Sequence, residues 1–331
     1  MPEHFQDYVA KVKPALDQAY ERWIGSLSDV IAFEDSAGLW AALQGGKKIR
    51  GCLLCLVTES MGGILQAAIP RAAAVEFIQT ATLIHDDFVD QDAVRRKLPA
   101  VWTLEDARRA VLLGDVIFAS AIKMMSDLSR EDGTVISDAI AQVARGALHE
   151  PLEPLGLAKQ IESGKLGGSL YEKIIYLKTG ILFGAACRLG AVAGQAPLDI
   201  RESLQRYGWR IGEAYQIADD LQEIRHHIAR GRIDSQKMLP LTPACLHFAP
   251  NSKPFLLEIL RSGPCEITGA FQAIFKQASQ RMRQDLERRL NLAVAEIKNV
   301  LPQSEYGELI HRTPWDLIGM FNAHSDKDDK D

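Results

Sequence analysis

Two short acidic clusters are the residues of this chain that could do chemistry. The first ends an apolar helical run and contains Asp86, Asp87 and Asp90. On one helix, Asp86 and Asp90 share a face, with Asp87 about 100° around the axis. Neighbouring carboxylates repel one another unless a cation neutralises them, and purely oxygen ligands favour Mg²⁺, which often shares its coordination with phosphate. The cluster therefore indicates a metal site and a phosphorylated substrate.

A second cluster, Asp219, Asp220 and Glu223, repeats this arrangement in another apolar helical segment. One such cluster alone could be the solvated acidic end of a helix. The two clusters are too far apart in the chain for a single metal-binding loop, but helices facing each other across a bundle core can hold metal between them. The repetition therefore favours metal binding.

Basic residues near helix ends form candidate anion sites. The segment Gly45–Arg50 reads GGKKIR and opens an apolar helical run, so its backbone and the basic side chains of Lys47, Lys48 and Arg50 could approach an anion. A Gly-Gly turn followed by exposed lysines gives the same pattern without any ligand. Arg95 and Arg96 follow the first acidic cluster; arginine forks suit diphosphate oxygens, although paired arginines are also common on surfaces.

Lys178 and Thr179 stand inside an otherwise apolar helical segment. A lysine in such surroundings either extends its ammonium group to the surface or meets a buried anion. The two acidic clusters favour a phosphate contact.

Composition excludes several classes of protein. The chain has 331 residues, 47% of them hydrophobic, and no obvious linker, so we expect one domain over residues 1–323 and a disordered acidic tail over 324–331. A net charge of −5 without a basic stripe argues against a nucleic acid partner. No signal peptide or membrane span is expected, which predicts a cytoplasmic location. The scattered cysteines are interpreted as buried thiols.

Helical periodicity runs through most of the chain, and no segment shows the alternation of a β-strand. The sequence therefore predicts an all-α fold. Small residues between Gly180 and Ala193 would allow close helix crossings. Helices are expected over residues 6–34, 71–90, 101–125, 135–148, 166–194, 204–230 and 264–300, with two helices in the last range.

Motifs in a fixed order make the chain resemble the trans-isoprenyl diphosphate synthases of the polyprenyl synthetase family. The resemblance covers most of the chain, from about Leu39 to Met320. It implies a single-domain helical bundle of the isoprenoid synthase type with a central active-site cavity, and a homodimer. The motifs are GGKKIR (Gly45–Arg50), EFIQTATLIHDDFVDQDAVRRKLP (Glu76–Pro99), LLGD (Leu112–Asp115), KTGILFGAACRLGAVAG (Lys178–Gly194) and YGWRIGEAYQIADD (Tyr207–Asp220).

The same resemblance implies a Mg²⁺-dependent prenyltransferase that joins isopentenyl diphosphate head to tail to an allylic diphosphate. Three Mg²⁺ ions, held by the two acidic clusters, would stabilise the departing diphosphate. The oxygen dipoles of Thr179 and Gln216 would stabilise a carbocation at the reacting carbon. The implied contacts are Arg95 and Lys178 with the allylic diphosphate, Lys47, Arg50, Gln79 and Arg96 with isopentenyl diphosphate, and Lys237 in the loop after the second cluster.

The chain departs from the family pattern at several positions. Lys48 replaces a usual Arg, Gln79 a frequent His and Glu223 a usual Asp, and the loop after Glu223 is short. Two alternatives are a related terpene cyclase and a non-catalytic regulatory subunit. The second diphosphate site speaks against the cyclase, and the presence of both acidic clusters speaks against the subunit.

Product length is expected to depend on the helix that carries the first acidic cluster. In this family the growing chain extends along that helix, and each turn descends about 5.4 Å, roughly one prenyl unit. Ala81 and Thr82, just before the cluster, are small. The resemblance therefore predicts a C20 product, geranylgeranyl diphosphate, or a longer one.

Overall fold

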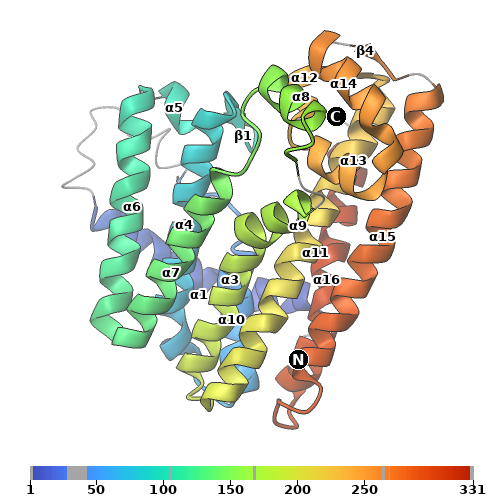
Figure 1. Ribbon diagram of the computed structural model, residues 1–331. Helices are drawn as coiled ribbons and strands as arrows, with labels where there is room; N and C mark the ends of the chain where they lie inside the picture. Colours follow the sequence, from blue (N-terminus) through green and yellow to red (C-terminus); the bar gives the residue numbers. More distant parts are fainter. Residues whose placement is uncertain are drawn as a thin grey trace. The chain divides into compact units, whose positions relative to one another are not determined.

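The computed structural model describes residues 3–27, 43–104, 106–166, 169–262, 265–267 and 269–328 (Figure 1). Helices form nearly all of its regular structure, which confirms the predicted all-α fold. Residues 28–34 of the first predicted helical range and residues 329–331 of the predicted tail lie outside the described residues.

The chain forms two compact units, each assembled from three separate stretches. Unit 1 contains Met1–Ala141, Leu182–Gly208 and Glu296–Thr313, and unit 2 contains Gln142–Ile181, Trp209–Ala295 and Pro314–Asp331. Every crossing from one unit to the other falls within a helix, so no change of composition marks a boundary. That the two units form one domain stays a prediction.

Unit 1 is built around α4 (Leu65–Val89), which packs against α3 (Ile49–Ser60) and α6 (Ala107–Leu128) (Figure 1). A close helix crossing occurs between Gly180 and Ala193, where the small residues of the sequence predicted one. A Cβ atom on Gly190 of α10 (Ile181–Ala193) would lie 2.5 Å from the carbonyl oxygen of Leu54, so only glycine permits this approach. This unit also contains α1 (Phe5–Gly25), β1 (Val94–Arg95), β2 (Leu98–Pro99), α5 (Val101–Leu104) and the larger part of α7 (Arg130–Ala147).

The core of unit 2 gathers apolar side chains from helices that are distant in sequence. It draws on α9 (Leu170–Ile175), α11 (Leu198–Arg230), α13 (Thr242–Phe248), α14 (Lys253–Ser262) and α15 (Gly269–Ile297). Apolar side chains of α11 therefore pack in one core with those of several other helices, which holds α11 in place. The remaining elements are α8 (Pro154–Glu162), η1 (Tyr176–Gly180), β3 (Arg232–Ile233), α12 (Ser235–Met238), η2 (Pro250–Ser252), β4 (Cys265–Glu266) and α16 (Glu305–Asp328).

Several local features differ from the predictions. β1 pairs with β2 and β3 with β4, both antiparallel. Strands of two residues are too short to show alternation in a sequence, which is why none was predicted. α15 is one helix where two were expected, because no Pro or Gly interrupts it after Gly269. α16 continues to Asp328, so residues 324–328 of the predicted disordered tail are helical.

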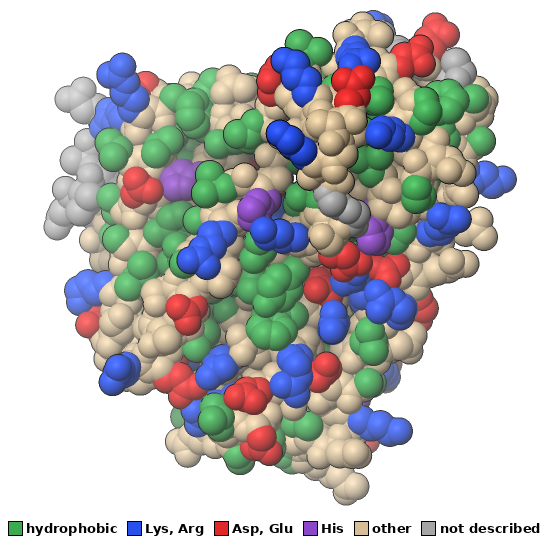
Figure 2. Space-filling view, viewed as in Figure 1, with side chains coloured by type: hydrophobic (Ala, Val, Ile, Leu, Met, Phe, Trp, Pro, Cys, Tyr) green, Lys and Arg blue, Asp and Glu red, His purple; other side chains and the backbone are tan. Residues whose placement is uncertain are grey.

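Burial agrees with the interpretation of the cysteines, because Cys52, Cys55, Cys187 and Cys245 are buried free thiols. Among the described residues, one helical run, Leu170–Ala193, is long and apolar enough to cross a membrane by length and composition alone. Of its most apolar window, 83% is buried inside the protein, as in a core helix. On the face shown in Figure 2, basic and acidic side chains are interspersed.

Candidate active site

The first acidic motif lies in unit 1 at the C-terminal end of α4. Asp90 caps this helix, and its N–H donates to the carbonyl oxygen of Asp86 at 2.8 Å, so the two residues are one turn apart as predicted. Asp87 is buried and accepts a hydrogen bond from Nε of Arg95 at 2.7 Å. Burial raises the pKa of Asp87, and the neighbouring Arg95 opposes that shift. Arg95, predicted to hold diphosphate, thus pairs with Asp87 here.

Arg95 belongs to a tight hairpin that also carries Arg96. Arg96 and Lys97 connect β1 to β2 with φ angles of 54° and 65°, the left-handed pair that a two-residue hairpin turn requires. Residues other than glycine are uncommon in this backbone conformation. Backbone strain of this kind is concentrated at functional sites. A Cβ atom on Gly46 would lie 2.9 Å from Nη1 of Arg96, so glycine lets the guanidinium group approach.

The GGKKIR segment and this hairpin therefore bring positive charge together in unit 1. Burial, and then the charge of Arg96, lowers the pKa of Lys47. Two neighbouring cations that disfavour each other are suited to share an anion. The guanidinium group of Arg50 lies 4.5 Å from the centre of the Phe183 ring, and Gln79 is half-buried on α4.

The GGKKIR segment could have been a Gly-Gly turn followed by exposed lysines, but Lys48 is buried. Its side chain is 3% exposed, and Nζ lies 3.1 Å from the centre of the Tyr20 ring. Burial lowers the pKa of Lys48 to about 8. Tyr20 in turn donates to the carbonyl oxygen of Leu43 at 3.1 Å. Lys48 thus fixes the segment from inside and leaves Lys47 and Arg50 as its two partly exposed cations.

In unit 2, three predicted site residues form one chain of hydrogen bonds. The Thr179 hydroxyl donates to Oε1 of Gln216 at 2.7 Å, and Nε2 of Gln216 donates to Oδ1 of Asp220 at 3.0 Å. The second oxygen of Asp220 accepts from the Tyr171 hydroxyl at 2.6 Å. Burial raises the pKa of Asp220 to about 7, and the charges of the neighbouring acids act in the same direction. Asp220 therefore faces inward and orients Gln216.

A π-helical turn presents Lys178 and Thr179. η1 replaces the α-helix over Tyr176–Gly180, and such turns are frequent at functional sites. A Cβ atom on Gly212 of α11 would lie 2.8 Å from the Thr179 carbonyl oxygen, so glycine allows α11 to approach this turn closely. Nζ of Lys178 donates to Oε2 of Glu150 at 2.6 Å.

A buried arginine holds the elements around this hydrogen-bonded chain. Arg289 is 2% exposed and contacts Glu172, Glu213 and Asp285, which come from α9, α11 and α15. Glu172 follows Tyr171 directly in the chain. The ion pairs of Arg289 therefore fix the two helices that carry Tyr171 and Gln216.

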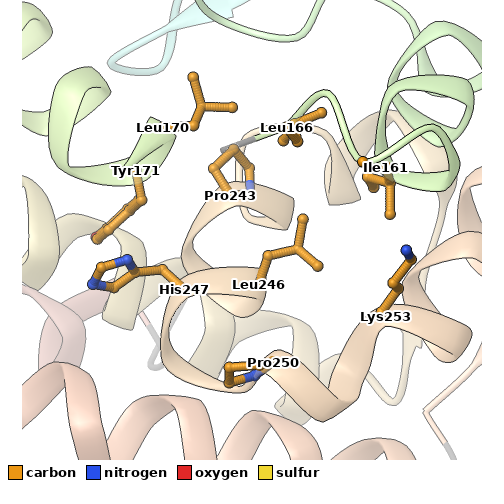
Figure 3. A pocket seen from close by; sticks show the side chains of 10 residues that line it. Ile161, Leu166, Leu170, Tyr171, Pro243, Leu246, His247, Pro250 and Lys253 are labelled. Carbon is orange, nitrogen blue, oxygen red and sulfur yellow. The ribbon is translucent and has the colours of Figure 1, made fainter. Parts of the chain in front are cut away.

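Tyr171 also lines a cavity of about 210 Å³ within unit 2 (Figure 3). The centres of the Tyr171 and His247 rings are 5.8 Å apart at one side of this cavity. The side chain of Lys253 lies on the other side, near Ile161. Most of the lining residues are apolar, and Tyr171 is one of the residues that form the wall.

Each unit contains oxygen donors suited to a hard cation. Among the described residues, no group of three or more His, Cys, Asp or Glu side chains could hold a metal ion as it stands. In each motif the middle Asp is engaged by a neighbouring side chain. The all-oxygen donor set fits Mg²⁺, and the metal-binding roles stay predictions. The other carboxylates are accessible: Asp90 and Asp219 are exposed, and Asp86 and Glu223 are half-buried.

Lys237 is exposed on α12, where its backbone N–H donates to Oδ1 of Asp234 at 2.8 Å. The substrate-binding role of Lys237 stays a prediction. Tyr171, Glu150 and Arg289 were missed by the sequence analysis. Tyr171 occupies an apolar helical position and would be interpreted as core, and the two charged residues have no motif that marks them.

Comparison with known proteins adds evidence independent of this geometry. Residues 37–277 match the family model described as Polyprenyl synthetase. The chain is 34% identical to the geranylgeranyl diphosphate synthase of Methanosarcina mazei over 54% of its own length and 55% of that protein. It is 29% identical to the octaprenyl diphosphate synthase of Escherichia coli over 72% of its own length and 74% of that protein. The Methanosarcina match thus spans little more than half of the relative's length.

Among solved structures, the chain resembles the polyprenyl synthase of Caulobacter crescentus complexed with calcium and isoprenyl diphosphate. The TM-score is 0.68 at 23% identity, and the match covers 96% of this chain and 98% of the other. At that identity the likeness shows the fold, and it agrees with the predicted isoprenoid synthase type.

Proposed function

Because this chain belongs to the polyprenyl synthetase family, we propose that it is a Mg²⁺-dependent prenyltransferase that joins isopentenyl diphosphate head to tail to an allylic diphosphate. The chain of hydrogen bonds from Thr179 through Gln216 to Asp220 carries this proposal. It fixes two side-chain oxygens next to Lys178. Oriented dipoles of this kind stabilise a developing positive charge better than mobile water does.

The allylic diphosphate is bound by Lys178 and Arg95. When the bond between the allylic carbon and the diphosphate oxygen breaks, negative charge collects on the diphosphate and positive charge on the carbon. The two cations stabilise the first, and the oxygens of Thr179 and Gln216 stabilise the second. The proposed ligands of Mg²⁺ are Asp86, Asp87 and Asp90 together with the second acidic motif, and the bound ion would add positive charge at the leaving group.

Isopentenyl diphosphate is bound by the basic group of unit 1. Lys47 and Arg96 disfavour each other electrostatically, so an anion beside them relieves their repulsion. Arg50 and Gln79 complete this proposed subsite. The double bond of isopentenyl diphosphate then attacks the allylic carbon, and the released diphosphate takes up the proton that the product loses.

The proposed product is C20 or longer. Ala81 is fully buried on α4, and its small side chain adds little bulk to this part of the helix. The names of the relatives cover different chain lengths, geranylgeranyl and octaprenyl, so the length must come from this chain's own residues. The homodimeric state and the cytoplasmic location stay predictions.

Incubation of the purified protein with labelled isopentenyl diphosphate, each allylic primer and Mg²⁺ tests the function. We expect linear prenyl diphosphates at C20 or above and no product after chelation of Mg²⁺. A cyclic hydrocarbon would indicate the cyclase alternative. Inactivity alone, regained with an added synthase, would indicate the regulatory subunit. The comparisons give no support to either alternative.

A further inference from the structure

Glu150 forms an ion pair with Lys178, a cation that the proposed reaction needs. Nζ of Lys178 lies 2.6 Å from Oε2 of Glu150, and the two side chains are 30% and 19% exposed. A partly buried pair is screened by water less than a surface pair. A carboxylate therefore already opposes the positive charge of Lys178 before any substrate arrives.

The position of Glu150 is built into the local fold. Its N–H donates to the carbonyl oxygen of Ala147 at 3.2 Å, and that of His149 donates to Gly146 at 2.9 Å, which closes a turn after α7. A Cβ atom on Gly146 would lie 2.8 Å from Cβ of Leu177, so glycine allows the end of α7 to touch η1. This contact places the carboxylate beside Lys178 through backbone geometry.

We propose that Glu150 sets the affinity of the allylic diphosphate site by competing with the diphosphate for Lys178. This inference rests on the proposed function, in which Lys178 binds that diphosphate. A lysine ammonium is a compact point charge, so a carboxylate and a phosphate oxygen compete for the same positive field. Binding of the diphosphate must break or stretch the Glu150 contact and bring two anions close together. The apparent affinity for the allylic diphosphate is therefore lower than it would be without the charge of Glu150.

Glu150→Gln tests this proposal because it keeps the shape and the carbonyl acceptor but removes the charge. We expect the KM for the allylic diphosphate to fall by about three- to tenfold. This change lies between the effects expected for the free energy of an exposed ion pair and for that of a buried charged hydrogen bond. The KM for isopentenyl diphosphate should stay unchanged, because Lys178 is assigned to the allylic substrate alone. A purely structural role for Glu150 would not separate the two constants.

Two further variants make the result specific. Glu153→Gln removes an exposed carboxylate from the same loop, and both KM values should match those of the wild type. In a Lys178→Met background, Glu150→Gln should no longer lower the allylic KM, because no cation is left to compete for. An allylic KM that is unchanged or higher in Glu150→Gln would overturn the proposal. Prenyl transfer by the wild-type protein, measured in the same experiment, shows separately whether the proposed function holds.

Discussion

Replacement of Arg289 by Met tests how the second acidic motif is held in place. The arginine is 2% exposed, and its guanidinium group contacts Glu172, Glu213 and Asp285. Methionine fills a similar volume without charge. The substitution therefore leaves three carboxylates around an apolar side chain.

The three carboxylates do not contribute equally to the loss. Glu172 is 38% exposed and can be hydrated, and Asp285 keeps its bond from Arg288. Glu213 is 6% exposed and keeps Arg210 at 3.2 Å. Removing one partner of a buried ion pair costs about 3–5 kcal/mol, so we expect a loss of that size in the free energy of unfolding, most of it from Glu213.

Urea denaturation followed by circular dichroism measures this loss. Arg289→Met combined with Glu213→Gln should recover about 1–3 kcal/mol, because the buried carboxylate that has lost Arg289 and keeps only the partly exposed Arg210 is then neutral. Equal stability of Arg289→Met and the wild type, or no recovery in the double variant, would refute the reasoning.

The same pair of proteins should differ in their response to acid. Burial alone would raise the pKa of Asp285, but its bonds and charge contacts with Arg289 and Arg288 lower that pKa overall. Stability from a carboxyl with a lowered pKa is present above its unfolded-state pKa and is lost as the pH falls through the folded-state value. The stability difference between wild type and Arg289→Met should therefore shrink below about pH 4.

Three further substitutions probe other parts of the account. Tyr171→Phe removes the donor to Asp220, so we expect kcat to fall by about tenfold or more with the fold retained by circular dichroism; an unchanged kcat would count against the role of this bond. The pKa of Lys48 is lowered to about 8, so the unfolded state binds more protons above that pH and the free energy of unfolding should rise between about pH 8 and 10. Lys48→Met should remove this slope in denaturation curves, and a slope that persists would show that another group causes it. Ala81→Phe should shorten the product by filling space along α4, and products of unchanged length in chromatography would show that this helix does not set the length.

The spacing of residues along helices was predictable from the sequence, and contacts between distant elements were not. Helical periodicity placed Asp86 and Asp90 one turn apart because that relation is local. The bond from Tyr171 to Asp220 joins α9 to α11, so neither segment alone contains a sign of it. A tyrosine at an apolar position looks like any core residue until its hydroxyl finds a partner.

Conformations that depend on tertiary packing were also beyond the sequence. The π-helical turn η1 keeps the apolar pattern of the surrounding helix, and its glycine contacts with α11 became visible only in the fold. Lys48 has the same chemistry as Lys47, yet it is buried over Tyr20 whereas Lys47 is partly exposed. Which of two adjacent lysines faces inward is decided by the left-handed backbone at Lys48, where φ is 52°.

Turnover of variants in the two acidic motifs tests the central claim, that both motifs serve one Mg²⁺-dependent prenyl transfer, most directly. Asp86→Ala and Asp219→Ala should each lower kcat by about a hundredfold or more at saturating Mg²⁺, while circular dichroism shows the wild-type fold. Asp138→Ala, which removes an exposed carboxylate outside both motifs, should keep wild-type turnover. Near-normal turnover in Asp86→Ala or in Asp219→Ala would contradict the claim.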